Sequence, residues 1–450
     1  MNKLGTKSFL HSAAVLILPV AAQNLITTAI NSLDVIMLGR VGENALSGAS
    51  LGNQVYFNMS LFLFGVTSGA AVLTSQYWGK KNMNAIAAIF GLAVKIGLGI
   101  SAVFFLAAML VPRQIMGLFT AEEEVIREGV IYLRWVCFSY PFTAFNLVYL
   151  NTMRSMERVR IATVAYTCSF FTNLAANAVL IFGLLGFPAL GVAGAAIGTI
   201  VARMMESAIV FLYDRKWNTV LRFRPAFLKI RNAPLSGDFW RYASPVIANE
   251  LLWGLGVSAI SGILGHLEKA AVAANAVAQV ARQLSMIIAF GVSAAATIEI
   301  GKKIGAGDME GAADYGKKYA VLSVFTGLLG ALVILAARPL VLHFMVLTDQ
   351  AKEYLSSMMF VLSYFVIGQS VNSTFIVGIF RAGGDTRFGF FFDLVFLWGV
   401  AIAGGAAAAF GFHAPVMVVY MILMSDEVLK LPVAWLRYRS RKWLRNITRD

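Results

Sequence analysis

Four polar side chains in an otherwise apolar sequence have the chemical types that bind a hard cation. Asp34 lies in NSLDVIMLG, with no basic residue within four positions. Asn173 and Asn177 lie four residues apart in FTNLAANAVL, a spacing that places both amides on one face of a helix. Thr199 follows in AIGTIV. A carboxylate, two amides and a hydroxyl could form a small oxygen site, and hard cations prefer oxygen ligands.

A structural role is open for the amides and the hydroxyl, because Asn and Thr also hydrogen-bond one membrane helix to another. The carboxylate is different. An acid at the centre of a membrane helix costs about 2.5–3.5 kcal/mol on insertion scales and is a functional candidate by default. Asp34 therefore needs a partner from another helix, which Asn173, Asn177 and Thr199 could provide.

Three acids in the second half of the chain are candidates for a cation or substrate site. Glu250 lies in PVIANELLWG, Asp385 in RAGGDT and Asp393 in DLVFLW. Asp385 also lies between Arg381 and Arg387, so an ion pair within its own loop is an equal alternative. Asp393 has no basic neighbour in the sequence, and both a functional and a structural role stay open for it.

Other acids have spacings that predict structural ion pairs, because side chains three or four positions apart are neighbours on a helix. These pairs are Arg203 with Glu206, and Lys430 with both Asp426 and Glu427. Glu299 lies beside Lys302 and Lys303 at the end of an apolar run, where an ion pair at the membrane surface and a role in transport are both open.

Pro19 and Pro245 interrupt two apolar runs, at residues 13–38 and 244–264. Proline removes a backbone hydrogen bond and bends a helix. Each proline is therefore either a hinge or a static kink.

The elements that must hold these residues are membrane helices. The chain has 450 residues, of which 59% are hydrophobic and 13% charged, whereas a soluble domain has about 25% charged residues. Twelve apolar runs are long enough to cross a bilayer core that takes about 20 helical residues. They lie at 13–38, 49–77, 85–111, 129–153, 159–182, 192–213, 244–264, 273–300, 319–337, 355–380, 388–410 and 414–435.

The distribution of basic residues predicts the orientation, because Lys and Arg stay on the cytoplasmic side. With both termini inside, cytoplasmic segments hold 26 of the 37 Lys and Arg, and external loops hold six. We therefore expect a multi-pass protein of the bacterial inner membrane with cytoplasmic termini. The net charge of +14 fits binding to anionic lipid headgroups, and no nucleic-acid partner is expected.

The two halves of the chain repeat one design. A shift of 226 residues aligns residues 19–87 with the second half without a gap, placing PV at residue 19 on PV at residue 245. An even number of helices in each half gives parallel repeats, related by an axis along the membrane normal. We predict an all-α polytopic protein with two six-helix bundles, 1–213 and 244–436, joined by a basic cytoplasmic connector at 214–243 and followed by a basic tail at 437–450.

The sequence lacks the signatures of an enzyme. It has no GxxxxGK[ST] phosphate loop, no GxSxG elbow and only four histidines, which are scattered without metal-ligand spacing. We expect no enzymatic activity and no cofactor, so the energy for transport must come from an ion gradient.

Several segments resemble the multidrug and toxic compound extrusion (MATE) family of cation-coupled antiporters. They are GRVGENALSGASLG at 39–52, FGLLGFPALGVAGAAIGT at 182–199, RAGGDTRFG at 381–389 and SDEVLKLPVAWLRYRSRKW at 425–443. The resemblance covers nearly the whole chain. It implies a V-shaped pair of bundles, helices 1–6 and 7–12, around a central cavity.

The resemblance also implies roles for individual residues. Asp34, Asn173, Asn177 and Thr199 fall on the positions that form the coupling-ion site in the first bundle of the family. Some members have a second aspartate where this chain has Asn177. The loss of that titratable group favours Na⁺ over H⁺ as the coupling ion. Glu250 matches a glutamate of the cation site in the second bundle of the Na⁺-coupled NorM-like branch.

The expected function is export of organic cations or drugs in exchange for Na⁺ or H⁺, by a monomer in contact with membrane lipids. Aromatic and methionine side chains suit bulky lipophilic cations. Two rival functions remain. A lipid-linked oligosaccharide flippase of the same superfamily would need a strongly cationic cavity, and an ion channel would be passive.

Overall fold

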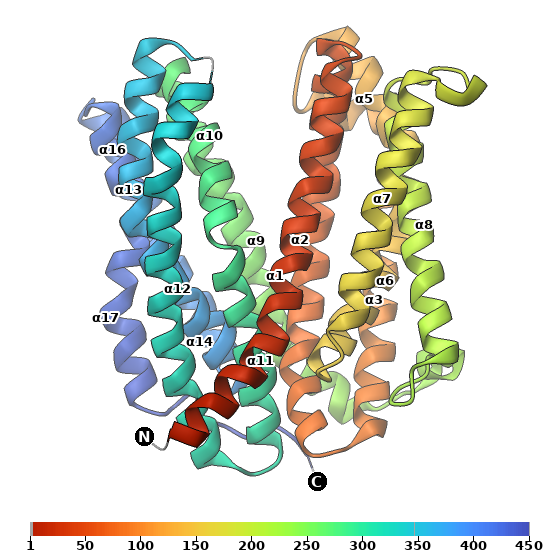
Figure 1. Cartoon of the computed structure of the whole chain (residues 1–450), viewed down its shortest axis with the longest axis vertical. Coiled ribbons are helices and arrows are strands. Elements are labelled where there is room, and N and C mark those ends of the chain that lie inside the picture. Colours follow the sequence, from red (N-terminus) through yellow and green to blue (C-terminus); the bar gives the residue numbers. More distant parts are fainter. Residues whose placement is uncertain (1–2, 346, 450) are drawn as a thin grey trace. The chain divides into compact units, whose positions relative to one another are not determined.

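The computed structural model describes residues 3–345 and 347–449, and all elements in that part of the chain are helices (Figure 1). The first half contains α1 (Lys3–Gly39), α2 (Glu43–Gly79), α3 (Met83–Leu110), α4 (Pro112–Gly117), α5 (Glu123–Val136), η1 (Cys137–Ser139), α6 (Tyr140–Ser155), α7 (Arg160–Phe182), η2 (Leu184–Gly186) and α8 (Val192–Lys216).

The second half begins after a short helix in the connector, η3 (Pro225–Lys229). It contains α9 (Ala233–Leu267), α10 (Lys269–Ser285), α11 (Ile287–Gly305), α12 (Met309–Phe344), α13 (Asp349–Ser373), η4 (Thr374–Phe380), α14 (Thr386–Asp393), η5 (Leu394–Ile402), α15 (Ala403–Ala406), η6 (Ala407–Gly411), α16 (Val416–Leu423) and α17 (Asp426–Arg439). Of these, η4, η5 and η6 are π-helices.

Nine helices within the described ranges are long and apolar enough to cross a membrane, and the bent pair α10–α11 would be a tenth span. The remaining two expected spans fall on broken helices. The run at 129–153 crosses the 3₁₀ turn η1 between α5 and α6, and the run at 414–435 crosses the break between α16 and α17. The prediction of an all-α polytopic membrane protein is confirmed.

The chain forms two compact units, which are described separately below. The first-half unit comprises residues 22–70 and 83–239, and the second-half unit comprises residues 1–21, 71–82 and 240–450. Helices α1 and α2 therefore each contribute to both units. The predicted bundle boundaries at 213 and 244 stay a prediction.

Each unit has its own apolar core. In the first-half unit, fully buried side chains from α2, α3, α5, α6 and α8 pack together, including Leu63, Leu133 and Tyr140. In the second-half unit, the core draws on α9 to α16 and includes Leu264, Met358 and Tyr420. Because these cores are apolar, a polar side chain buried beside them needs a hydrogen-bond or ion-pair partner.

The connector folds against the first-half unit. Phe223 and Phe227 pack edge-on against Phe90 of α3, with ring centroids 6.0 and 6.5 Å apart. The carboxylate of Asp214 at the end of α8 accepts the backbone N–H of Phe223 at 2.9 Å and the hydroxyl of Tyr149 at 2.9 Å. The connector is polar, as expected, and it is held by specific contacts.

The basic tail is also packed, within the second-half unit. Trp443 is 1% exposed and stacks on Tyr438 with ring centroids 5.9 Å apart. Gln76 of α2 donates to the carbonyls of Ala382 and Arg445 at 2.7 and 3.0 Å. The tail is thus an integral part of this unit.

Candidate functional site

The structure brings Asp34, Asn173 and Asn177 into one cluster inside the first-half unit. The amide Nδ2 of Asn177 donates to Oδ1 of Asp34 at 2.6 Å and to Oδ1 of Asn173 at 3.2 Å. Both asparagines are almost completely buried, at 1% and 0% exposure. The i,i+4 spacing on α7 aligns the two amides, and α1 brings the carboxylate to them.

The carbonyl oxygen of the Asn177 side chain makes this cluster incomplete. Asn177 Oδ1 is buried and has no hydrogen-bond partner among the described residues. Gly198 of α8 lies against this oxygen, and a Cβ at that position would overlap it. Helices α7 and α8 lie side by side (Figure 1), so the missing side chain of Gly198 makes room for the amide. A buried acceptor without a donor beside a carboxylate is an arrangement that a cation would complete.

Thr199 lies next to Gly198, but its hydroxyl is used locally. Thr199 Oγ1 donates to the carbonyl of Ala195 in the preceding turn at 3.1 Å. The hydroxyl oxygen keeps acceptor capacity for a cation. The structure thus joins three of the four predicted residues by hydrogen bonds and places the fourth on the adjacent helix.

The predicted ion pair between Arg203 and Glu206 is confirmed, with a 2.6 Å contact between Nη1 and Oε2. Glu206 is 2% exposed, so removing only one partner would leave a buried charge uncompensated. This pair lies on α8, one turn beyond Thr199. It is a structural neighbour of the Asp34 cluster.

Sequence reasoning missed Gln23, which ties α1 to α6 and α7. Its Nε2 donates to the carbonyl of Val159 at 3.2 Å and to Oγ1 of Thr163 at 3.1 Å, and its Oε1 accepts from Arg154 at 2.6 Å. Its position inside the apolar run at 13–38 was the feature of the sequence that could have identified it. Gln23 lies four residues after Pro19 and fixes the helix just beyond the proline.

Glu250 has a basic partner in the second-half unit. Arg381 Nη2 lies 2.8 Å from Glu250 Oε1, and the two side chains are 4% and 12% exposed. Asp385 pairs with Arg437 of α17, at 2.8 Å from Nε and 2.7 Å from Nη2 to Oδ2. Arg437 was not predicted as a partner, because the basic residues near Asp385 in the sequence are Arg381 and Arg387.

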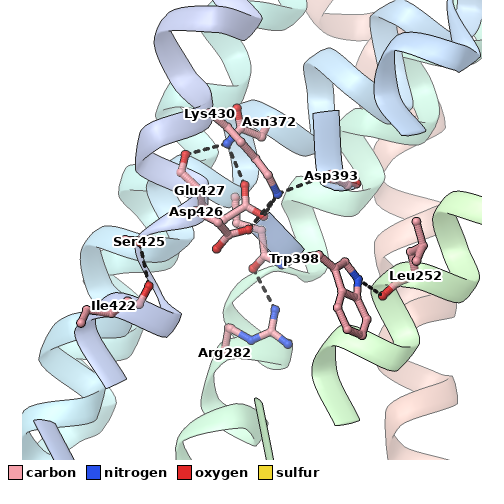
Figure 2. A network of polar contacts seen from close by, with 11 residues as sticks. Leu252, Arg282, Asn372, Asp393, Trp398, Ile422, Ser425, Asp426, Glu427 and Lys430 are labelled. Atoms are coloured by element: carbon pink, nitrogen blue, oxygen red, sulfur yellow. Dashed lines mark hydrogen bonds and ion pairs between the residues drawn. The ribbon is translucent and has the colours of Figure 1, made fainter. Parts of the chain in front are cut away.

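Asp393 also has a partner that its local sequence does not contain, because Lys430 reaches it from α17 (Figure 2). The Lys430 ammonium lies 2.8 Å from Asp393, 2.8 Å from Asp426 and 3.6 Å from Glu427. The predicted pairing of Lys430 with its helix neighbours is confirmed, and Asp393 joins it. We call these four residues the Lys430 cluster.

Two further polar side chains beside the Lys430 cluster were missed from sequence. Asn372 of α13 donates from Nδ2 to the carboxylate of Glu427 at 2.7 Å and to the backbone carbonyl of Glu427 at 2.6 Å. Arg282 of α10 is 7% exposed and donates to Gln369 at 2.9 Å. Figure 2 also shows the Trp398 indole donating to the Leu252 carbonyl, at 3.1 Å.

Glu299 accepts a hydrogen bond from the hydroxyl of Tyr319 at 2.6 Å. Nearby, Lys303 pairs with Asp308 at 2.9 Å in the turn between α11 and α12. The hydrogen bond from Lys303, and then the backbone N–H of Gly311, hold the pKa of Asp308 below its ordinary value. Lys303 thus stabilises the turn through Asp308. For Glu299, an ion pair at the membrane surface and a role in transport both stay open.

Both predicted hinge prolines lie inside continuous helices, Pro19 in α1 and Pro245 in α9. The division of α1 between the two units falls after Ala21, two residues beyond Pro19. Whether either helix bends during a reaction cycle stays a prediction.

Several carboxylates are buried inside the helices of this membrane protein, and such acids mark functional sites, including substrate and ion pathways. The sequence model of the MatE family matches residues 19–179 and again residues 245–406. The two matches begin 226 residues apart, at Pro19 and Pro245, which is the shift that aligns the halves. The chain therefore belongs to the MATE family of transporters.

Individual relatives agree with this assignment. The chain is 25% identical to the "Probable multidrug resistance protein NorM" of Mesorhizobium japonicum, over 88% of this chain and 86% of the relative. It is 27% identical to the NorM protein of Brucella suis, over 88% and 85%.

Solved structures show the same fold. A variant of the Vibrio cholerae MATE transporter VcmN matches with a TM-score of 0.87 at 18% identity, covering 98% of this chain and 100% of that one. The eukaryotic MATE transporter AtDTX14 matches with a TM-score of 0.86 at 17% identity, covering 98% of both chains.

Proposed function

We propose that this protein is a secondary active antiporter that exports organic cations or drugs in exchange for Na⁺ or H⁺. Its relatives are named as multidrug resistance proteins, which supports this substrate class. In this proposal it acts as a monomer in the bacterial inner membrane, with both termini in the cytoplasm, and it needs no cofactor beyond the coupling ion.

The observation that carries the proposal is the contact of Asp34 with Asn177, whose carbonyl oxygen is buried without a partner. Among the described residues, Asp34 has no ion-pair partner, because its carboxylate is bound by an amide instead. A half-buried carboxylate of this kind has no counter-charge in direct contact, and Na⁺ or H⁺ can supply one. The amide oxygens of Asn173 and Asn177 and the hydroxyl of Thr199 would be the additional ligands for Na⁺.

Ion binding at Asp34 would drive transport by shifting the protein between two conformations. A ligand shifts such an equilibrium only by its differential affinity for the two states. Helix α1 can supply the two states, because it contains Pro19 and contributes to both units. Pro245 occupies the equivalent place in the repeat and is proposed as the matching hinge in α9.

The amide at residue 177 bears on the choice of ion. A second carboxylate there would give a proton relay two titratable groups, whereas Asn177 leaves Asp34 as the one acid of the cluster. We therefore favour Na⁺, with H⁺ as the alternative coupling ion.

The second-half acids can bind a cation or substrate only by exchanging partners. Glu250 is held by Arg381, Asp385 by Arg437 and Asp393 by Lys430. A cationic drug or a coupling ion would have to displace these basic groups. We propose Glu250 as the first of the three to do so, because it lies on α9 five residues after Pro245.

Transport by the purified protein in lipid vesicles tests the function. A fluorescent organic cation is supplied at equal concentration on both sides, and an inward-directed or outward-directed Na⁺ or pH gradient is then imposed. The antiporter moves the dye against its own gradient, and the movement stops when the ion gradient is collapsed. Simple equilibration of ions without dye transport would indicate a channel. Movement of a lipid-linked oligosaccharide without movement of the dye would indicate a flippase.

A further inference from the structure

The Lys430 cluster contains more negative than positive charge. Three carboxylates, Asp393, Asp426 and Glu427, surround one ammonium group at 2.8, 2.8 and 3.6 Å. All three acids are buried, at 8%, 3% and 8% exposure, and Lys430 is 3% exposed. Since a buried ion is stable only when it is paired, this ratio is costly if every acid is ionised.

The surrounding helices do not balance the cluster. Helix α17 packs against α13, η4 and η5, and it also contacts α14, where Arg437 lies over the ring of Phe388 at 4.8 Å. Near the cluster, α13 presents the amides of Asn372 and Gln369, and η4 and η5 contain no charged residue. On α14, the Arg387 side chain is exposed. Within the described part of the chain, the other buried basic group beside the cluster is Arg282 of α10, whose guanidinium donates to Gln279 and Gln369. If all three acids of the cluster are ionised, their three negative charges exceed the two positive charges of Arg282 and Lys430 by one.

An unpartnered acceptor lies beside the same acids. Asn372 is 2% exposed, and its Nδ2 is bonded to Glu427. Its Oδ1 is buried and has no hydrogen-bond partner among the described residues. A protonated carboxyl group would provide both the missing positive charge and a new O–H donor at this point.

The helices also leave regular α-geometry around this cluster. Helix α13 passes into the π-helix η4 at Thr374, two residues after Asn372, and α14 passes into the π-helix η5 directly after Asp393. The break between α16 and α17 comes directly before Asp426. π-helical segments occur frequently at functional sites. Three helices are thus interrupted where the excess charge lies.

We propose that the Lys430 cluster is a proton-binding site of the second-half unit and that Glu427 carries the proton. Glu427 is the acid farthest from the ammonium, at 3.6 Å, whereas Asp393 and Asp426 form close ion pairs at 2.8 Å. A metal cation would have to displace Lys430 from the point where the oxygens converge, but a proton needs only to add to a Glu427 oxygen. The proton comes from water and forms one O–H bond.

Glu427 is not among the residues of the proposed function, whose coupling ion acts at the Asp34 cluster. The two sites lie in different units and would titrate separately. A proton at Glu427 would make the second-half unit sensitive to pH even when Na⁺ is the coupling ion at Asp34.

Infrared spectroscopy of the full-length protein in lipid tests the proposal directly, because a protonated carboxyl group has a C=O stretching band that ionised carboxylates lack. We expect such a band at a pH where acids that are paired with a single basic group, such as Asp385, are ionised. The band should shift when the protein is exchanged into D₂O. Glu427→Gln should lose it. Asp385→Asn, a control for an acid paired one-to-one with Arg437, should keep it.

A second variant covers the case in which Glu427→Gln does not fold. Glu427→Asp retains a carboxyl group in a shifted position, so the band should persist at a changed frequency. An unshifted band in Glu427→Asp, or an undiminished band in Glu427→Gln, would overturn the assignment. A band that disappears only in Asp34→Asn belongs to Asp34, and Glu427 would then be ionised, contrary to the proposal.

Discussion

The candidate cation-binding acids of the two units have different partners. In the second-half unit, Glu250, Asp385 and Asp393 each contact a basic side chain at 2.7–2.8 Å. In the first-half unit, Asp34 contacts the amide of Asn177, and it forms no ion pair within the described part of the chain. An acid with a built-in counter-charge is already neutralised, whereas an acid held by amides can take a mobile cation. The difference points to Asp34 as the place where the coupling ion acts.

The largest effect on stability is expected where a built-in counter-charge is removed. Lys430→Met leaves three buried carboxylates without their ammonium group, and breaking a buried ion pair on one side costs about 3–5 kcal/mol. The free energy of unfolding in detergent measures this loss. Arg113→Gln is the control, because Arg113 and Glu123 are 70% and 67% exposed and such pairs contribute about 0–1 kcal/mol. Equal losses in both variants would remove the contrast between the units.

A smaller effect is expected at Gly198, which tests whether the amides of the Asp34 cluster must keep their positions. Gly198→Ala places a methyl group on the side-chain oxygen of Asn177, and overpacking of this kind costs about 1–3 kcal/mol. Ion-coupled efflux should fall as the amide is displaced. Gly262→Ala in α9 is the matched control, since nothing lies within 4 Å of its added Cβ. Unchanged coupling in Gly198→Ala would mean that the position of Asn177 does not matter.

The smallest effect is expected at an acid outside the spans. The pKa of Asp308 is lowered by Lys303 and the Gly311 N–H, so its contribution to stability is present above its unfolded pKa and is lost as the pH falls through its folded pKa. Asp308→Asn should therefore lose less stability than the parent below about pH 4, while Asn still caps α12. Unfolding at a series of pH values measures this. Identical acid sensitivity would show that the turn contributes nothing.

Local spacing was enough to predict part of the polar structure. The pairs Arg203–Glu206 and Lys430–Asp426 lie within single helices, where three or four positions make side chains neighbours. The shared face of Asn173 and Asn177 follows from the same rule. The fold class followed from apolar runs and from the repeat of 226 residues.

Contacts between distant helices could not be predicted in this way. Glu250 and Arg381 lie 131 positions apart, and Asp385 and Arg437 lie 52 apart. Such pairs depend on how helices pack, which hydropathy and spacing do not encode. The sequence therefore identified the acids, but not which of them carry their own counter-charge.

The residue at 177 offers a way to sharpen the account of the coupling ion. Asn177→Asp adds a second carboxylate beside Asp34, and two acids that share one site hold a proton more strongly than one does. Efflux should become more dependent on the pH gradient and less dependent on Na⁺. Unchanged ion dependence would count against the proposed site.

The most direct test of the central claim is gradient-driven efflux by Asp34→Asn in lipid vesicles, measured beside the parent at equal amounts of folded protein. The substitution keeps the size of the side chain and removes its charge. Because coupling free energies are typically about 1–3 kcal/mol, we expect the stimulation of efflux by the ion gradient to fall by about 5- to 150-fold, with the drug still bound. Efflux by Asp34→Asn that still follows the Na⁺ or pH gradient as in the parent would contradict the claim.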